Sequence, residues 1–425
     1  MVDLARDGDE TGWRSNPGAV PAAARTAYAR LSRGWEISDT DRATALPAAP
    51  DAAAERVASV DAVRGFAMFF IVAGDALAWA LHDMALGREG PLSAVARFVS
   101  IQLQHAPWEG FRFYDFLFPL FIFVTGISIV FSLPGLVERE GEWAAHKRVL
   151  RRSFLLFVLG LIYYGGAGNL WPEVRLVGVL QRIALCYLFV SLLFLHLNVR
   201  GLIVAFVSLL IGYWALMTFV SVPEVGAGSF TREANLARWI DAQYLPGLRL
   251  YGEWDPEGLL STPPAVGTCL LGVFAGLLLR DTRVEPMQKA LWLMGAGVVL
   301  VEAGYLWGLQ FPVIKYIWTS SFVLVAGGYS ALLLGMSYLL LDICGRKAWA
   351  TVFLWFGANA ILLYMINNMV GFQNVAYKLV GGDIARFIDA QLTKGAASFV
   401  NVTVGITLAI LLARYFYRRK IFLRV

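Results

Sequence analysis

A histidine followed closely by a tryptophan and a carboxylate is the most chemically informative feature of the sequence. His105 lies in the stretch QHAPWEG, and Asp115 follows in YDFLFP. An imidazole with a pKa near 6.5 can take and return a proton near neutral pH, so His105 is the candidate catalytic base. The alternative is an interfacial histidine beside a tryptophan belt. Three further histidines, for which we expect surface or interfacial roles, are His82, His146 and His196.

Polar residues also recur near one end of several apolar segments. A charge at the centre of a membrane helix costs about 2.5–3.5 kcal/mol on insertion scales, so such residues indicate function by default. Asp75 or Asp115 is expected to orient His105 or make it more basic, and Asp115 with Arg182 is a candidate ion pair. We expect one site to gather these groups with residues that support it or bind an acceptor, namely Asp255, Glu257, Trp108, Trp318, Ser320, Ser321, Asn367 and Asn368.

Composition indicates which elements position these residues. The 425 residues are 58% hydrophobic and 16% charged, whereas soluble domains are about 45–50% apolar and about 25% charged. This composition excludes a soluble enzyme and general disorder. The apolar residues come in blocks of about 20, the length that crosses a bilayer core. The sequence therefore predicts an all-α, polytopic membrane protein embedded in a lipid bilayer.

We expect ten membrane spans, with both termini in the cytoplasm. The connecting segments on one side hold 18 Lys/Arg in 61 residues, and those on the other side hold 11 in 113. The richer side is assigned to the cytoplasm by the positive-inside rule. The expected spans are 63–81, 114–134, 152–170, 176–197, 201–222, 262–280, 288–307, 318–341, 350–372 and 396–414.

The chain is expected to have a disordered cytoplasmic arm over residues 1–58 and a transmembrane domain over 59–425. The arm is rich in Ala, Arg, Asp and Pro and has no apolar run. The three cysteines form neither a disulfide framework nor a metal-ligand cluster, and a single outer histidine is no zinc site. We therefore expect no metal. The basic excess reflects orientation and lipid contact, and no nucleic-acid motif is present.

Several stretches resemble, in order, those of the transmembrane acyltransferases related to heparan-α-glucosaminide N-acetyltransferase. The segment RVASVDAVRGFA at 56–67 is similar to their R-x-x-S-x-D-x-x-R-G opening, and HAPWEG with DFLFP is similar to H-x-x-W-N-G and D-L-x-F-P. Further matching blocks are VGVLQR at 177–182, DPEGLL at 255–260, WTSS at 318–321 and GANAIL at 357–362. The resemblance covers roughly residues 56–420.

The resemblance implies an enzyme that takes acetyl-CoA from the cytoplasm and acetylates an amino sugar or related glycan across the membrane. It implies that His105 is the catalytic residue, and that Asp75 stands where the lysosomal enzyme has Asn. We expect the inner membrane of a bacterium, and the sequence leaves a homodimer open. Candidate ligands of the coenzyme, most of them cytoplasmic cations, are Arg64, Arg148, Arg151, Arg152, Lys347 and Asn359.

Other function classes fit part of the pattern. A sugar O-acyltransferase of the same superfamily shares every feature except the acceptor. A secondary transporter also suits ten spans and an outer polar cluster, but the sequence shows neither similarity between its halves nor paired broken helices. A third alternative is a non-catalytic protein that keeps the fold.

Overall fold

The structure is a computed structural model that describes residues 57–423, and these residues form helices and loops without a β-strand. This confirms the predicted all-α fold class. The expected arm lies almost entirely outside the described residues. Eight helices within 57–423 are long and apolar enough to cross a membrane, or nine if one bent pair counts as a single span. The chain is therefore a multi-pass membrane protein.

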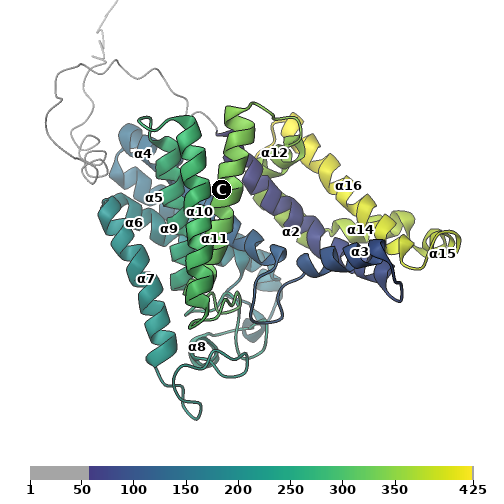
Figure 1. The fold of residues 1–425 in the computed structure, drawn as a ribbon, viewed down its shortest axis with the longest axis horizontal. Coiled ribbons are helices and arrows are strands. Elements are labelled where there is room, and N and C mark those ends of the chain that lie inside the picture. Colours follow the sequence, from purple (N-terminus) through teal and green to yellow (C-terminus); the bar gives the residue numbers. More distant parts are fainter. Residues whose placement is uncertain (1–56, 424–425) are drawn as a thin grey trace, which may run out of the picture.

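The eight long apolar segments run between two ends of the molecule (Figure 1). They are α2 (Ala58–Ala85), α4 (Leu117–Glu140) with its leading 3₁₀ turn η1 (Phe113–Phe116), α6 (Val179–His196), α7 (Val199–Phe219), α9 (Thr262–Arg280), α10 (Pro286–Gly308), α11 (Ser320–Tyr338) with its π-helical end η4 (Leu339–Ile343), and α16 (Ala396–Arg418). The helices that accompany them are α3 (Pro91–Gln102), α5 (Glu142–Tyr163), α8 (Leu236–Tyr244), α12 (Thr351–Ala358), α13 (Ala360–Met369), α14 (Phe372–Val380) and α15 (Gly382–Gln391).

Helix α5 differs from the span predicted at 152–170. It begins at Glu142 and ends at Tyr163. Its first turns carry Arg148, Arg151 and Arg152, so it is not among the helices apolar enough to be candidate spans. The difference arises because backbone hydrogen bonding continues through the charged residues, whereas hydropathy marks only the apolar part.

The span predicted at 350–372 is broken in the middle. Helices α12 and α13 meet at Asn359 with a bend of 79°. Asn359 itself has φ −134° and ψ 34°, outside helical values. Irregular backbone at membrane depth is tolerated where protein surrounds it, and the Asn359 side chain is 2% exposed.

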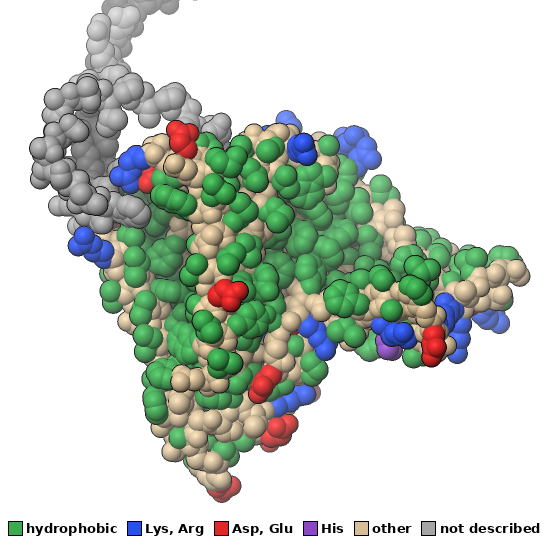
Figure 2. Space-filling model, viewed as in Figure 1, with side chains coloured by type: hydrophobic (Ala, Val, Ile, Leu, Met, Phe, Trp, Pro, Cys, Tyr) green, Lys and Arg blue, Asp and Glu red, His purple; other side chains and the backbone are tan. Residues whose placement is uncertain are grey.

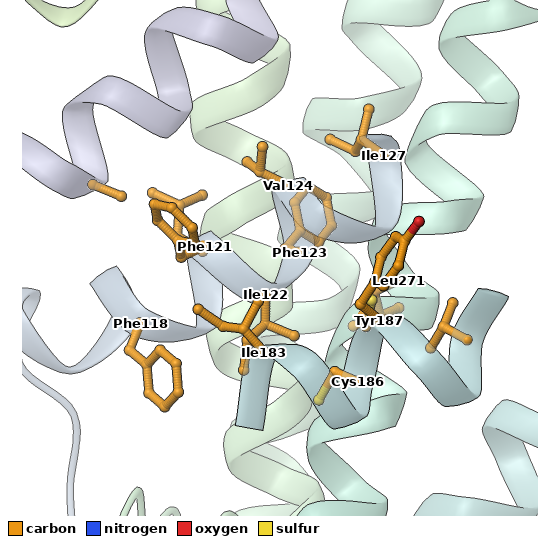
Figure 3. Close-up of a cluster of buried hydrophobic side chains, with 14 of the residues drawn as sticks. Phe118, Phe121, Ile122, Phe123, Val124, Ile127, Ile183, Cys186, Tyr187 and Leu271 are labelled. Atoms are coloured by element: carbon orange, nitrogen blue, oxygen red, sulfur yellow. The ribbon is translucent and has the colours of Figure 1, made fainter. Parts of the chain in front are cut away.

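Helix α4 forms the centre of the largest core cluster. Its residues Phe121, Ile122 and Phe123 pack near Ile183 of α6 and Leu271 of α9 (Figure 3). Helices α4 and α9 approach closely because each has a glycine at the crossing. A Cβ at Gly126 would overlap the carbonyl oxygen of Cys269, and one at Gly272 would overlap that of Phe123.

Charged side chains gather at the two ends of the helices, and the surface between them is mostly hydrophobic (Figure 2). Helices α3, α14 and α15 extend sideways from the end that also carries α8 (Figure 1). On this projecting part the charged side chains lie along the lower edge and hydrophobic ones above it (Figure 2). We call the end with α8 the His105 end, because the candidate site lies there.

Candidate functional site

His105 is held by Asp115 at the start of α4. Its Nδ1 lies 2.8 Å from Oδ1 of Asp115. The imidazole side chain is 38% exposed, whereas the carboxylate is 0% exposed. A carboxylate accepts hydrogen bonds, so Nδ1 carries the proton and Nε2 keeps its lone pair. The structure thus gives His105 the tautomer that a proton acceptor needs.

The second oxygen of Asp115 organises the loop that carries His105. Oδ2 accepts hydrogen bonds from the backbone N–H of Ala106, at 3.1 Å, and of Arg112, at 3.0 Å. The Arg112 guanidinium in turn donates to the carbonyl of His105 at 3.0 Å. The ion pair expected between Asp115 and Arg182 is therefore wrong, because Asp115 uses its oxygens for His105 and this loop.

Lys315, between α10 and α11, is a member of the site that the sequence analysis missed. Its Nζ lies 2.8 Å from Nδ1 and 2.9 Å from Nε2 of His105. The same atom lies 3.7 Å from Oδ1 of Asp115, and the lysine side chain is 13% exposed. An acid, an imidazole and an amine therefore meet at one place.

Partial burial and the neighbouring charge of Lys315 lower the pKa of His105 below its ordinary value of 6.5, against the opposite influence of Asp115. Burial also lowers the pKa of Lys315, but from an ordinary value of 10.5. The imidazole of His105 is consequently neutral at neutral pH.

Asp75 of α2 contributes to the site at longer range. Its side chain is exposed, and within residues 57–423 the carboxylate hydrogen-bonded to His105 is that of Asp115. The charge of Asp75 raises the pKa of His105 by less than the charge of Asp115 does. The ring of Tyr114 packs 4.8 Å from the His105 ring and against Gly74, beside Asp75. Of the two carboxylates expected to orient His105, Asp115 is the one in contact.

Aromatic side chains cover the loops next to His105. Trp108 stacks on Tyr316, with ring centroids 5.6 Å apart and an interplanar angle of 7°. Trp254 lies edge-on to Trp108 at 5.6 Å and stacks on Tyr251 at 4.7 Å. The Trp108 indole donates to the carbonyl of Phe230 at 2.9 Å. We call Trp108, Tyr251, Trp254 and Tyr316 the aromatic wall.

A second ionic cluster joins Arg175, in the loop before α6, to the loop before α9. Arg175 donates to both oxygens of Asp255, at 2.8 and 2.7 Å, and to Glu257 at 2.8 Å. Burial works against the charge of Asp255, but the bidentate Arg175 holds the pKa of this carboxyl below its usual range. Burial and the neighbouring Asp255 raise the pKa of Glu257. Asp255 and Glu257 thus lie together on Arg175, and their expected role in supporting the His105 site stays a prediction.

Arg182 of α6 contacts the same loop before α9. Its guanidinium donates to the Gly258 carbonyl at 3.2 Å and to the hydroxyl of Ser261, and it lies 5.0 Å from the centre of the Trp318 ring. The residue is 1% exposed. Arg182 therefore holds the loop before α9 in place, through its contacts with Gly258, Ser261 and Trp318.

Three residues expected to bind the acceptor are enclosed by the protein. Ser320 donates to the carbonyl of Leu210 at 2.7 Å, and Ser321 donates to that of Phe311 at 2.6 Å. The buried Trp318 indole donates to the hydroxyl of Thr268 at 3.1 Å. These contacts fix the start of α11, so the assignment of Trp318, Ser320 and Ser321 to acceptor contact is corrected to a structural role.

The two asparagines at the end of α13 lie apart from the His105 contacts. The Asn368 amide donates to the carbonyl of Tyr163 and joins α13 to α5, and Asn367 is half-buried. Their proposed role in acceptor binding stays a prediction.

The candidate coenzyme ligands lie toward the opposite end. Arg64 pairs with Asp61 at 2.9 Å and donates to Ser128 at 2.9 Å. Asn359 accepts from the backbone N–H of Leu423 at 3.4 Å, and within residues 57–423 its buried Nδ2 has no partner. The remaining cations are Arg148, Arg151 and Lys347, which are exposed, and Arg152, which stacks on Tyr187.

Other features of the described chain are less suited to catalysis. A groove of about 600 Å³ between α6, α7 and α9 is lined mainly by apolar side chains and contains His196 as its ionisable group. Within residues 57–423, no group of three or more His, Cys, Asp or Glu side chains could hold a metal ion. The groups suited to acyl transfer are those around His105.

Comparison with known proteins confirms the resemblance indicated by the motifs. The chain is 27% identical over 387 residues to heparan-α-glucosaminide N-acetyltransferase of Homo sapiens, covering 76% of this chain and 56% of that protein. Identity to the Mus musculus protein of the same name is 26% over 383 residues, with the same coverage. The chain thus spans little more than half the length of these relatives. No family model matches the sequence.

Proposed function

We propose that this chain is a membrane acyltransferase that moves an acetyl group from acetyl-CoA to an amino sugar at the His105 end. The observation that carries the proposal is the hydrogen bond of 2.8 Å between the partly exposed imidazole of His105 and the buried carboxylate of Asp115. The similarity to two N-acetyltransferases over 76% of the chain supports the same reaction class.

The arrangement suits removal of a proton from an attacking amine. As the amine nitrogen bonds to the thioester carbonyl carbon, Nε2 of His105 takes the amine proton. Asp115 stabilises the imidazolium that forms, since its carboxylate already accepts from Nδ1. The C–S bond then breaks, and the imidazolium returns the proton to the coenzyme thiolate. The products are an N-acetyl sugar and coenzyme A.

A covalent route uses the same groups. Nε2 attacks the thioester carbonyl carbon, the C–S bond breaks, and the acetyl group rests on His105 until the amine takes it. The two routes differ in one observable. Acetyl-CoA without acceptor leaves an acetyl group on the His105 peptide only in the covalent route, and mass spectrometry after rapid quenching detects it.

The coenzyme is proposed to bind from the cytoplasm at the end opposite His105. The exposed Arg148 and Arg151 are suited to the coenzyme phosphates. The Asn359 amide, whose Nδ2 has no partner among the described residues, suits a carbonyl of the pantetheine arm, because a buried N–H donor without a partner costs free energy. In this proposal the break between α12 and α13 places this donor inside the membrane domain.

The acceptor is proposed to be an amino sugar of the envelope or of a scavenged glycan, outside the inner membrane. The aromatic wall beside His105 offers flat apolar faces that suit the C–H face of a sugar ring.

The test is turnover of acetyl-CoA by the purified protein against amino sugars and matched sugars that carry a hydroxyl instead of the amine. Release of free coenzyme A together with an N-acetyl sugar supports the proposal. Acetylation of the hydroxyl sugars alone would identify a sugar O-acyltransferase. Absence of turnover with every acceptor, together with uptake of a sugar into vesicles, would identify a transporter.

A further inference from the structure

The contact between Lys315 and His105 joins two loops that are far apart in sequence. The two residues are 210 positions apart, yet Nζ of Lys315 lies within 2.9 Å of both imidazole nitrogens. A flexible exposed lysine would prefer water. This side chain is instead only 13% exposed and aims its amine at the imidazole.

The backbone holds Lys315 in this place from both sides. Glu109 and Ile314 form an isolated antiparallel bridge, and the N–H of Gly110 donates to the carbonyl of Val313 at 2.9 Å. The N–H of Ile314 also donates to the hydroxyl of Thr319 at 3.1 Å. The loop with Lys315 is therefore tied to the loop with His105, and their contact follows from the fold.

Charged and polar groups around the pair come from three elements. Asp115 and Tyr114 lie on η1, Asp75 lies on α2, and the charge of Glu257 reaches Lys315 from the loop before α9. Arg112 directs its guanidinium to the His105 carbonyl and not to the ring. The carboxylates favour a positive charge on the amine or on the imidazole, but two such charges within 2.9 Å repel each other.

The surroundings favour a charged lysine and a neutral histidine. Burial and the neighbouring charge of Lys315 lower the pKa of His105 below 6.5, so the imidazole is neutral at neutral pH. Burial lowers the pKa of Lys315 from 10.5, whereas the carboxylate of Asp115, 3.7 Å from Nζ, favours the protonated amine.

We propose that Lys315 is a positioning residue whose ammonium group holds His105 in its neutral form, with Nδ1–H directed at Asp115 and Nε2 unprotonated. The catalytic meaning of this arrangement rests on the function proposed above, but the charge relationship does not. The ammonium group also lies 2.9 Å from Nε2, close to where an acceptor amine gives up its proton.

The charge relationship can be tested without any measurement of enzyme turnover, through the reaction of His105 with diethyl pyrocarbonate. This reagent modifies the neutral imidazole but not the imidazolium. The fraction of the His105 peptide that is modified is measured by mass spectrometry over about pH 5 to 8, a range that brackets the ordinary histidine pKa. The midpoint is the pH at which modification is half of its maximum. The midpoint for the wild-type protein is expected below 6.5, the ordinary value for histidine. A wild-type midpoint above 6.5 would overturn the inference without any variant.

Variants at position 315 separate charge from packing. Lys315→Met is expected to raise the midpoint by about one pH unit, because the repulsion by the ammonium group is gone while burial and the carboxylates still act on the imidazole. Lys315→Arg keeps the positive charge and is expected to keep the low midpoint. Lys378→Met, at an exposed lysine of α14, is the matched control and should leave the midpoint unchanged. The midpoint is compared and not the rate, because removal of a side chain also changes access to the ring.

The catalytic consequence is read from the pH dependence of kcat/KM. Lys315→Met should lose activity below neutral pH. It should regain much of that activity toward about pH 8, because the His105 imidazole loses its proton there. An equal loss at every pH would show a merely structural role and contradict the inference. Wild-type protein without turnover would reject the proposed function alone, whereas turnover with an unmoved midpoint in Lys315→Met would reject this inference alone.

Discussion

Oδ1 of Asp115 lies 2.8 Å from Nδ1 of His105, while Oδ2 of the same carboxylate accepts the backbone N–H groups of Ala106 and Arg112. One buried carboxylate therefore sets both the tautomer of the imidazole and the shape of the loop that presents it. Substitutions at Asp115 should consequently affect chemistry through His105.

Asp115→Asn is predicted to reduce kcat/KM by about 10²–10⁴-fold. The backbone N–H groups of Ala106 and Arg112 donate to the amide oxygen of the new side chain, so its NH₂ group faces the imidazole. His105 Nδ1 then accepts, and the proton moves to Nε2, the wrong tautomer for a base. Asp75→Asn is the matched control and should cost less than about tenfold, because Asp75 acts at longer range. Equal losses in the two variants would refute the assigned roles.

His105→Ala is predicted to reduce turnover by about 10²–10⁴-fold, the usual scale of acid–base catalysis. Coenzyme A should still stabilise the variant in a thermal-shift titration, because the proposed coenzyme ligands lie toward the other end. His82→Ala is the control, since His82 lies at the exposed end of α2. Near-wild-type turnover by His105→Ala would move the search for the base to other residues.

The pH profile of the wild-type enzyme should have its acidic midpoint below 6.5, because burial and Lys315 lower the pKa of His105. Activity is therefore complete near neutral pH and is lost as pH falls through the folded-state value. Unfolding takes up a proton between that value and 6.5, so the contribution of His105 to stability also falls as pH falls through this window. An acidic midpoint well above 6.5 in kcat/KM would be incompatible with this assignment.

The contacts of His105 differ in how far apart in sequence the partners lie. His105 and Asp115 are ten positions apart, and their spacing within one motif made both candidates. Lys315 was missed because its contact with His105 depends on a bridge between Glu109 and Ile314, which no periodicity reveals. The sequence did contain an indication of Lys315. It is the sole Lys or Arg within 308–316, a connecting segment on the side of the membrane that has few Lys and Arg residues.

The helices were more predictable than their irregularities. Apolar blocks identified every long span, because length and hydropathy are properties of a continuous segment. The break at Asn359 was not predicted, since the residues around it are as apolar as those of a straight span. The burial of Ser320 and Ser321 was not predicted either. The sequence around a hydroxyl at a helix start is the same whether that hydroxyl faces a ligand or a neighbouring carbonyl.

Arg175→Met is predicted to destabilise the protein by about 3–5 kcal/mol, because it leaves the carboxylates of Asp255 and Glu257 without their buried cation. Unfolding in detergent with increasing denaturant measures the loss. Arg238→Met removes an arginine from a more exposed pair with Glu253 and should cost less than about 1 kcal/mol. Similar losses for both variants would show that burial of the Arg175 cluster contributes nothing.

The central claim is that an acetyl group passes from a coenzyme on one side of the membrane to an amino sugar at His105 on the other. The most direct measurement uses proteoliposomes of known protein orientation, with the amino sugar only on the side of His105 and acetyl-CoA only on the side of Arg148 and Arg151. We predict that the N-acetyl sugar forms on the His105 side with wild-type protein and is reduced by about 10²–10⁴-fold with His105→Ala. Product that forms only when both substrates share one side, or that forms equally with His105→Ala, would contradict the account.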